Sequence, residues 1–130
     1  MTTGTFTQAE IKGIVTCIPE NYRTLDEDLH ILYGGDLAKL ERIKKSIGLN
    51  KRHIVEGEMT SADLCEAAAK ALLKSHQINK DSIDALICVT QTPDYFQPCN
   101  AAYLHGQLDL TNSCAAFDVN QGCSGYIYGL

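Results

Sequence analysis

Two short apolar runs, separated by a helical pattern, constrain the fold of this chain more than any other feature. The runs are residues 85–89 (ALICV) and 115–119 (AAFDV), and residues 99–108 between them have a helical pattern. An unbroken apolar run of this length is typical of a strand that is covered on both faces. Strands that alternate with helices indicate an α/β fold with a mostly parallel sheet.

The remaining segments fit the same fold class. Residues 11–18 (IKGIVTCI) predict a first strand and residues 51–55 (KRHIV) a short edge strand, whereas the polar residues 21–30 could begin a short helix. Apolar residues spaced by three and four, with capping residues at the ends, predict two further helices, and a third helix is expected to begin near the end of the chain. These helices cover residues 37–47, 60–74 and 122–130.

Charge and hydropathy exclude several classes of protein. The chain has 130 residues, 45% of them apolar, with 11 basic and 16 acidic residues and a net charge of -5, which argues against a nucleic-acid-binding role. No apolar run approaches the ~20 residues that cross a bilayer, and the first ten residues do not form a secretory signal. Lys and Arg are absent after Lys80. This absence suggests that the last fifty residues form a core, a subunit interface, or both.

The six cysteines do not form a disulfide or zinc pattern. They stand at positions 17, 65, 88, 99, 114 and 123, with no Cys-X-X-Cys pair. Most are expected to be small buried residues. Close-spaced ligand pairs are missing, so we predict no metal site and expect reduced thiols in a cytoplasmic protein.

Cys123 is the candidate catalytic residue. The segment 117–125 (FDVNQGCSG) predicts a strand, a tight turn and a cysteine at the first turn of a helix. The partial positive charge at a helix N-terminus stabilises a thiolate. Gly122 and Gly125 would leave room for a substrate carbonyl, and the N–H of Cys123 could help to hold an oxyanion. The alternative is that Cys123 is one more small buried residue.

These residues resemble the N-terminal part of the thiolase-fold condensing enzymes, most closely β-ketoacyl-acyl carrier protein synthase III. Four segments carry the resemblance in order, and together they span nearly the whole chain. They are IKGIVTCIPENYRT, IGLNKRHI, INKDSIDALICVTQT and AAFDVNQGCSGYIYGL. Because the family's enzymes are well over twice as long, the resemblance implies that residues 1–130 are the first part of a layered thiolase-like α/β domain, truncated after the nucleophile. We therefore expect the chain alone to be inactive.

The resemblance also implies a reaction. An acyl group passes from a thioester of coenzyme A or of a carrier protein to Cys123. Malonyl-carrier protein then loses carbon dioxide, and its carbanion attacks the acyl-cysteine in a Claisen condensation. The His and Asn that assist in the family come from the second half, and no histidine of this chain matches them. No bound cofactor is implied, the acyl carrier protein is a partner, and Phe96 is expected to reach the partner subunit's acyl pocket in a homodimer.

Arg42 and Lys45 are the other substrate-binding candidates. With Lys44 they could hold phosphates or an acidic carrier protein, or they could simply form a solvated basic helix face. The family often has a Trp and an Arg at the places near Arg42 and Ser46. Their replacement leaves a carrier-protein thioester open as donor beside acyl-coenzyme A.

Two other functions remain open, and the sequence argues against a third. The related hydroxymethylglutaryl-CoA synthases use a Glu near the place of Gln91, and a Gln cannot exchange a proton in that role. Relatives that transfer the acyl group to an oxygen or nitrogen nucleophile are not excluded by this half of the chain. A non-catalytic α/β module for dimerisation or scaffolding is the alternative from a different class.

Overall fold

The structure is a computed structural model that describes residue 5 and residues 7–130. The chain forms two compact units. The larger unit contains residues 1–17 and 61–130, and the smaller unit contains residues 18–60.

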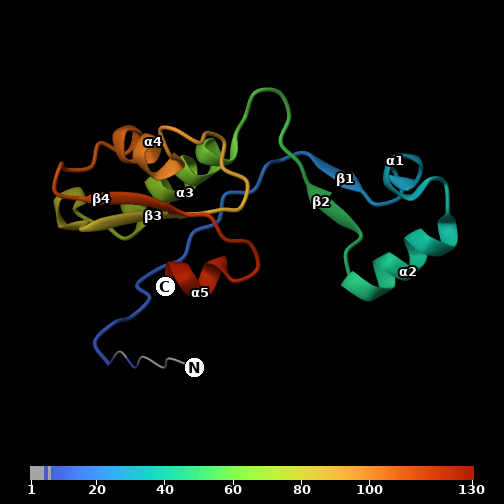
Figure 1. Cartoon of the computed structure of the whole chain (residues 1–130), viewed down its shortest axis with the longest axis horizontal. Coiled ribbons are helices and arrows are strands. Elements are labelled where there is room, and N and C mark those ends of the chain that lie inside the picture. The colour runs from blue at the N-terminus through green and yellow to red at the C-terminus, as the bar shows by residue number, and fades with distance from the viewer. Residues whose placement is uncertain (1–4, 6) are drawn as a thin grey trace. The chain divides into compact units, whose positions relative to one another are not determined.

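The larger unit is built around two parallel strands. Strand β3 (Ala85–Val89) pairs with β4 (Ala115–Val119), and Ala85 lies opposite Ala115. Helices α3 (Ser61–Ser75) and α4 (Asn100–Gln107) lie on one side of the pair, and the short α5 (Gly125–Gly129) lies on the other, as Figure 1 shows. A 3-10 helix, η1 (Lys80–Ser82), precedes β3. The α/β class and the parallel pairing predicted from the two apolar runs are confirmed.

The core of the larger unit lies between the strand pair and the two helices. Leu86 and Cys88 of β3 and Ala116 of β4 face α3 and α4, because alternate strand residues point to the same side. A buried cluster combines Cys88 with Ala62 of α3 and with Ala101 and Leu104 of α4. A second cluster, Leu108, Leu110 and Cys114, closes the end where the strands begin.

The opposite face of the strand pair is largely open. Ile87 is 38% exposed, Val89 37% and Phe117 46%. The prediction that both faces are covered is therefore wrong for this chain, because helices pack along only one of them. On the second face, α5 reaches only the carboxyl end, at Val89, and its own Tyr126, Ile127 and Tyr128 remain exposed.

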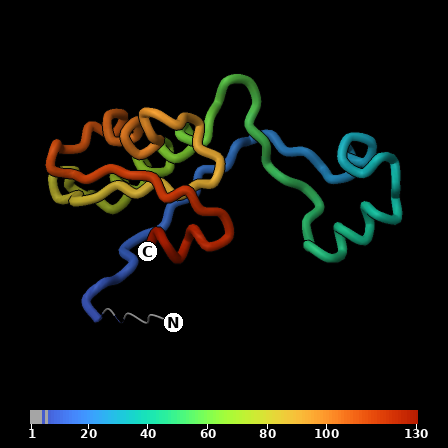
Figure 2. Tube along the Cα trace, in the orientation of Figure 1, coloured from blue at the N-terminus to red at the C-terminus, as the bar shows by residue number. Residues whose placement is uncertain are grey.

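The first predicted strand is not formed. Residues 11–18 have no regular secondary structure, and Ile11, Ile14 and Ile18 are each more than half exposed. Their backbone forms no hydrogen-bonded ladder with another described segment. The trace stays extended there, as the blue part of Figure 2 shows. The prediction fails because a strand requires a hydrogen-bonded neighbour as well as suitable residues.

The smaller unit contains two helices and a two-stranded antiparallel sheet. Strand β1 (Tyr22–Thr24) pairs with β2 (Lys51–His53), which confirms a strand in the predicted segment 51–55. Helix α1 (Leu29–Tyr33) begins later than the helix expected within 21–30. The predicted helix 37–47 is α2 (Leu37–Ile47), and the Asp36 side chain accepts a hydrogen bond from the Lys39 N–H at 2.9 Å.

A buried ion pair ties this smaller sheet to α1. Asp28, which is 1% exposed, lies 2.7 Å from the Arg52 guanidinium and 3.6 Å from that of Arg23. Arg23 belongs to β1 and Arg52 to β2. The Asp28 carboxylate therefore forms ion pairs with both strands from its position just before α1. Leu25 and Leu40 are the buried apolar side chains of the smaller unit.

Candidate active site

Cys123 lies in a tight turn that joins β4 to α5. The Gln121 N–H donates to the Val119 carbonyl, and the Gly125 N–H donates to the Gly122 carbonyl, both at 2.9 Å. This second bond closes a turn, and α5 starts at Gly125 with Ser124 as its N-cap. Cys123 therefore lies two residues before the first residue of α5. The prediction that Cys123 lies in the first turn of the helix is wrong by these two residues. The residue is exposed, so its thiol is open to an incoming thioester.

The loop that follows β3 lies against this turn. A Cβ atom on Gly122 would collide with Oε1 of Gln91. The absence of a side chain at residue 122 thus allows the Gln91 amide to lie directly against the residue that precedes Cys123. Gln91 was considered in the sequence only as a replacement for a glutamate, and the structure brings it to the candidate site.

The two glycines of helix α5 pack against the side chain of Val89 in β3. Cβ atoms on Gly125 and Gly129 would each come within 2.7 Å of a Val89 methyl, of Cγ1 and Cγ2 respectively. The two glycines are one helical turn apart, so they form a groove that receives both methyl groups. The helix behind Cys123 is therefore positioned by the carboxyl end of the strand pair.

Two aspartates hold the elements around the 91–98 loop. Asp94 accepts hydrogen bonds from the N–H of Ser61 at 3.2 Å and of Ala62 at 2.7 Å, at the start of α3. Asp118 accepts from the N–H of Asn100 at 3.0 Å and of Ala101 at 2.7 Å, at the start of α4. Each carboxylate satisfies helix N–H groups that have no partner within the helix and complements the positive helix end.

Asn100 links these two caps. Its side-chain amide donates to Asp94 at 3.2 Å, and its Oδ1 accepts from the Tyr95 N–H at 3.4 Å. Asn100 is 1% exposed. Sequence reasoning missed this network, although a lone acid in the apolar strand 115–119 was a usable signal, because a carboxylate in such a place needs donors.

Phe96 points away from the unit that carries it. The residue is 97% exposed, at the centre of the loop that Asp94 and Asn100 anchor. A large apolar side chain on an anchored loop is available to a partner, which is the geometry that the expected role of Phe96 needs.

The basic residues of α2 are engaged unequally. Lys44 lies 2.6 Å from an Asp26 oxygen, and this hydrogen bond raises the pKa of Lys44. Arg42 lines an open cavity of about 280 Å³ together with Asp36, Ala38 and Lys39. Lys45 is exposed and does not line that cavity. The structure thus places Arg42 and Lys45 in the smaller unit, whereas Cys123 and Phe96 belong to the larger one.

A second exposed thiol, that of Cys65, was not expected from the sequence. Cys65 of α3 is exposed, and a hydrogen bond with the Cys88 side chain of β3 lowers the pKa of Cys65 to about 7. The same contact raises the pKa of Cys88, with burial acting in the same direction.

In the described part of the chain, no group of three His, Cys, Asp or Glu side chains is placed to hold a metal ion. No helix there is long and apolar enough to span a membrane.

Comparison with known proteins points to one kind of enzyme, although no family model matches the chain. A Campylobacter jejuni protein named as a 3-oxoacyl-[acyl-carrier-protein] synthase 3 is 45% identical over 125 residues, which are 96% of this chain and 35% of that protein. The β-ketoacyl-[acyl-carrier-protein] synthase III of Thioalkalivibrio sulfidiphilus is 36% identical over 129 residues, 95% of this chain and 37% of the relative.

Solved structures agree with these relatives. The crystal structure of a 3-oxoacyl-(acyl-carrier protein) synthase from Burkholderia xenovorans matches with a TM-score of 0.78 and 39% identity, over 88% of this chain and 32% of that one. A 3-oxoacyl-(acyl-carrier-protein) synthase III structure matches with a TM-score of 0.75 and 34% identity, over 91% of this chain and 34% of that one. The thiolase-like fold is thereby confirmed, and the chain spans about a third of the length of the relatives it matches. In sequence and in fold, nearly the whole chain is thus similar to one third of a β-ketoacyl-acyl carrier protein synthase III, a condensing enzyme of fatty acid biosynthesis.

Proposed function

We propose that this chain supplies the nucleophile, Cys123, of a β-ketoacyl-acyl carrier protein synthase III-like acyltransferase. The observation that carries the proposal is the exposed Cys123 in the turn between β4 and α5, in a chain whose similarity to these synthases extends over 96% of its length. Residues beyond this third of the enzyme would provide the His and Asn that assist the reaction, so the chain alone would be inactive.

The first half-reaction is acyl transfer. The Cys123 thiolate attacks the carbonyl carbon of an acyl thioester, and the tetrahedral intermediate expels the thiolate of coenzyme A or of the carrier protein. The exposure of Cys123 in the turn supports this step, because a thioester can reach the thiol. The backbone N–H of Cys123 would help to hold the oxyanion of the intermediate.

The second half-reaction is the condensation. Malonyl-carrier protein loses carbon dioxide, and the carbanion left behind attacks the acyl carbon bound to Cys123. The new carbon–carbon bond forms as the carbon–sulfur bond breaks, which returns the Cys123 thiolate and releases 3-oxoacyl-carrier protein. No cofactor takes part in this chemistry.

The proposal includes substrate contacts and assembly. Arg42 and Lys45 would attract the phosphates of coenzyme A or the acidic surface of the carrier protein, and the free position of Lys45 supports this. Phe96 would reach the acyl pocket of the partner subunit in a cytoplasmic homodimer, and its near-complete exposure supports that role.

The decisive test is acyl trapping on the cysteine. The complete protein is incubated with acetyl- and octanoyl-coenzyme A, and separately with the acyl-carrier proteins, and digested peptides are analysed by mass spectrometry. We expect a stoichiometric acyl group on Cys123 and none after Cys123→Ala. Cys65→Ala is the matched control, because it removes an exposed thiol outside the turn and should leave acylation intact.

Two alternatives give different results. A non-catalytic scaffold would show no acylation with any donor, and the open apolar face formed by Ile87, Val89 and Phe117 is the observation that favours it. An acyltransferase that uses an oxygen or nitrogen nucleophile would acylate Cys123 but would not release carbon dioxide from malonyl-carrier protein.

A further inference from the structure

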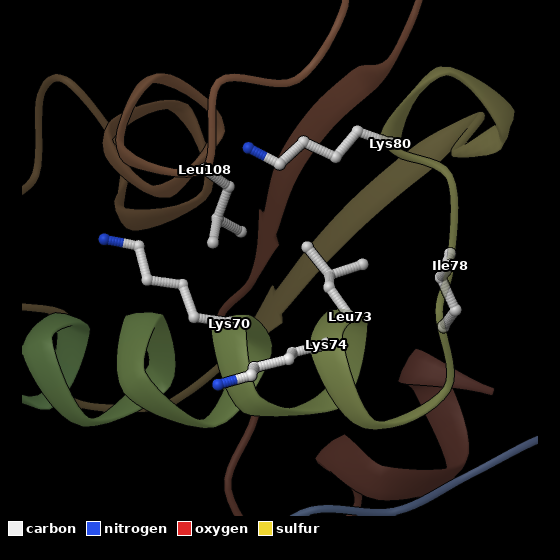
Figure 3. Close-up of a pocket in the computed structure, with 6 residues that line it drawn as sticks. All are labelled: Lys70, Leu73, Lys74, Ile78, Lys80 and Leu108. Carbon is white, nitrogen blue, oxygen red and sulfur yellow. The ribbon is translucent and has the colours of Figure 1, made fainter.

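Three lysines surround a small apolar pocket in the larger unit, away from the candidate active site. The pocket has a volume of about 290 Å³ and is lined by Leu73, Ile78 and Leu108 together with Lys70, Lys74 and Lys80. Figure 3 shows that Lys70 and Lys80 extend from opposite walls toward the side where Leu108 lies, with Leu73 between them. The floor is apolar and the charges stand around the rim.

The position of the pocket separates it from the proposed chemistry. It lies between the last turns of α3, η1 and the end of α4, and η1 comes immediately before β3. Cys123 follows β4. Because β3 and β4 run parallel, their starting ends and their carboxyl ends lie at opposite edges of the sheet, and the pocket is at the edge away from Cys123.

Two of the three lysines that line the pocket form no ion pair with a described residue. Lys70 forms an ion pair with Glu66. Lys74 and Lys80 form no ion pair with any described residue, although the chain as a whole carries a net charge of -5. Two unpaired ammonium groups on an acidic protein create a local preference for anions, and the lysine side chains act as mobile point charges.

We propose that this pocket binds an amphipathic anion, namely a carboxylate with a short aliphatic chain. The aliphatic chain would lie on Leu73, Ile78 and Leu108, where it removes apolar surface from water. The carboxylate would accept charge-assisted hydrogen bonds from Lys74 and Lys80. The apolar lining and the unpaired lysines belong to the same pocket. A ligand that uses both therefore carries an aliphatic chain and a negative charge in one molecule.

The test compares three probes on the complete protein by isothermal titration calorimetry and by ligand-observed NMR. Octanoate has both the aliphatic chain and the carboxylate. Octanol has only the chain, and acetate has only the carboxylate. Each charge-assisted hydrogen bond contributes about tenfold in affinity, so octanoate should bind roughly 100-fold more weakly to the double variant Lys74→Gln/Lys80→Gln. Raised salt should weaken binding to the wild type more than to this variant.

The controls make the outcome decisive. Lys39→Gln removes a lysine from the smaller unit and should change nothing, and Cys123→Ala should retain octanoate binding if the pocket is separate from the candidate active site. Equal binding of octanoate to the wild type and the double variant would overturn the proposal. So would acetate or octanol binding as tightly as octanoate, or binding that is lost in Cys123→Ala.

Discussion

The carboxylate of Asp118, near the end of β4, accepts a hydrogen bond from the backbone N–H of Ala101 at 2.7 Å, although the two residues are 17 positions apart. A second bond, from Asn100 at 3.0 Å, makes Asp118 the cap of α4. Ala101, in the first turn of α4, is fully buried. One side chain therefore joins the strand that leads to Cys123 with the helix that covers the sheet.

Replacing Asp118 should weaken this connection. Asp118→Ala leaves two N–H groups at the helix start without acceptors, and we expect a loss of about 2 kcal/mol in the free energy of unfolding. Urea denaturation followed by circular dichroism measures it. Asp84→Ala is the matched control, because Asp84 is exposed and its side chain forms no hydrogen bond with a described residue. Equal effects of the two substitutions would show that the cap does not contribute.

Adding a methyl group at Gly125 should displace α5. The new Cβ would meet a Val89 methyl at 2.7 Å, and rotating Val89 would not relieve the contact, because its other methyl fills the space at Gly129. We expect Gly125→Ala to cost about 1–3 kcal/mol, measured by denaturation. Gly106→Ala is the control, since a Cβ there meets nothing within 4 Å. In a helix this change should be neutral or stabilise by up to about 1 kcal/mol.

The labelling rate of Cys65 should depend on pH around neutrality. Its pKa is lowered to about 7 by the Cys88 hydrogen bond, so the thiolate accumulates, and alkylation accelerates, as pH rises through 7. Cys88→Ala removes the hydrogen bond and should move this rise to higher pH. Pulsed iodoacetamide labelling between pH 5.5 and 9, read by peptide mass spectrometry, gives both curves, and an unchanged profile in Cys88→Ala would exclude the mechanism.

The same experiment measures the reactivity of Cys123. We expect iodoacetamide to label Cys123 faster than the other cysteines near neutral pH. Cys65 is its main competitor, since both residues are exposed. An acyl thioester should distinguish them, because Cys123 lies in an exposed turn, whereas Cys65 lies within helix α3 and forms a hydrogen bond with Cys88. Transfer of the acyl group to Cys65 instead would contradict the nucleophile assignment.

Local patterns predicted what local interactions decide. The cap at Asp36 and the helix end at Gly48 follow from short-range spacing, and the structure has them. The pairing of β3 with β4 joins segments 30 residues apart, and it was predicted because two apolar runs separated by a helical pattern favour a parallel pair. The strand expected at residues 11–18 is not formed, because no described segment of the chain provides it with a hydrogen-bonded neighbouring strand. The contact of Gln91 with Gly122 and the Asp118 cap join segments far apart in the chain, so no window of sequence could display them.

Phe96 should influence which acyl chains the enzyme accepts. Its side chain is 97% exposed on a loop anchored by Asp94 and Asn100, so it can enter a partner's pocket without rearrangement. Phe96→Ala should shift the chain-length profile of the complete enzyme toward longer acyl groups, measured with a series of acyl-coenzyme A donors. Tyr95→Ala is the neighbouring control. A profile that does not change would remove Phe96 from the substrate-binding residues.

Strand β4 should form the centre of a homodimer. It pairs with β3 on one side only, and its other edge has no strand partner among the described residues. An unpaired apolar edge favours pairing with another chain, and a contact between identical edges closes into a dimer. We expect the interface to include residues 115–119 and the 91–98 loop, and the complete protein to sediment as a dimer at micromolar concentration. Ala115→Lys places a charge on the exposed side of β4 and should shift the equilibrium toward monomer, whereas Ala102→Lys, on the exposed side of α4, should not. A monomeric wild type, or equal behaviour of the two variants, would show that β4 is not the contact.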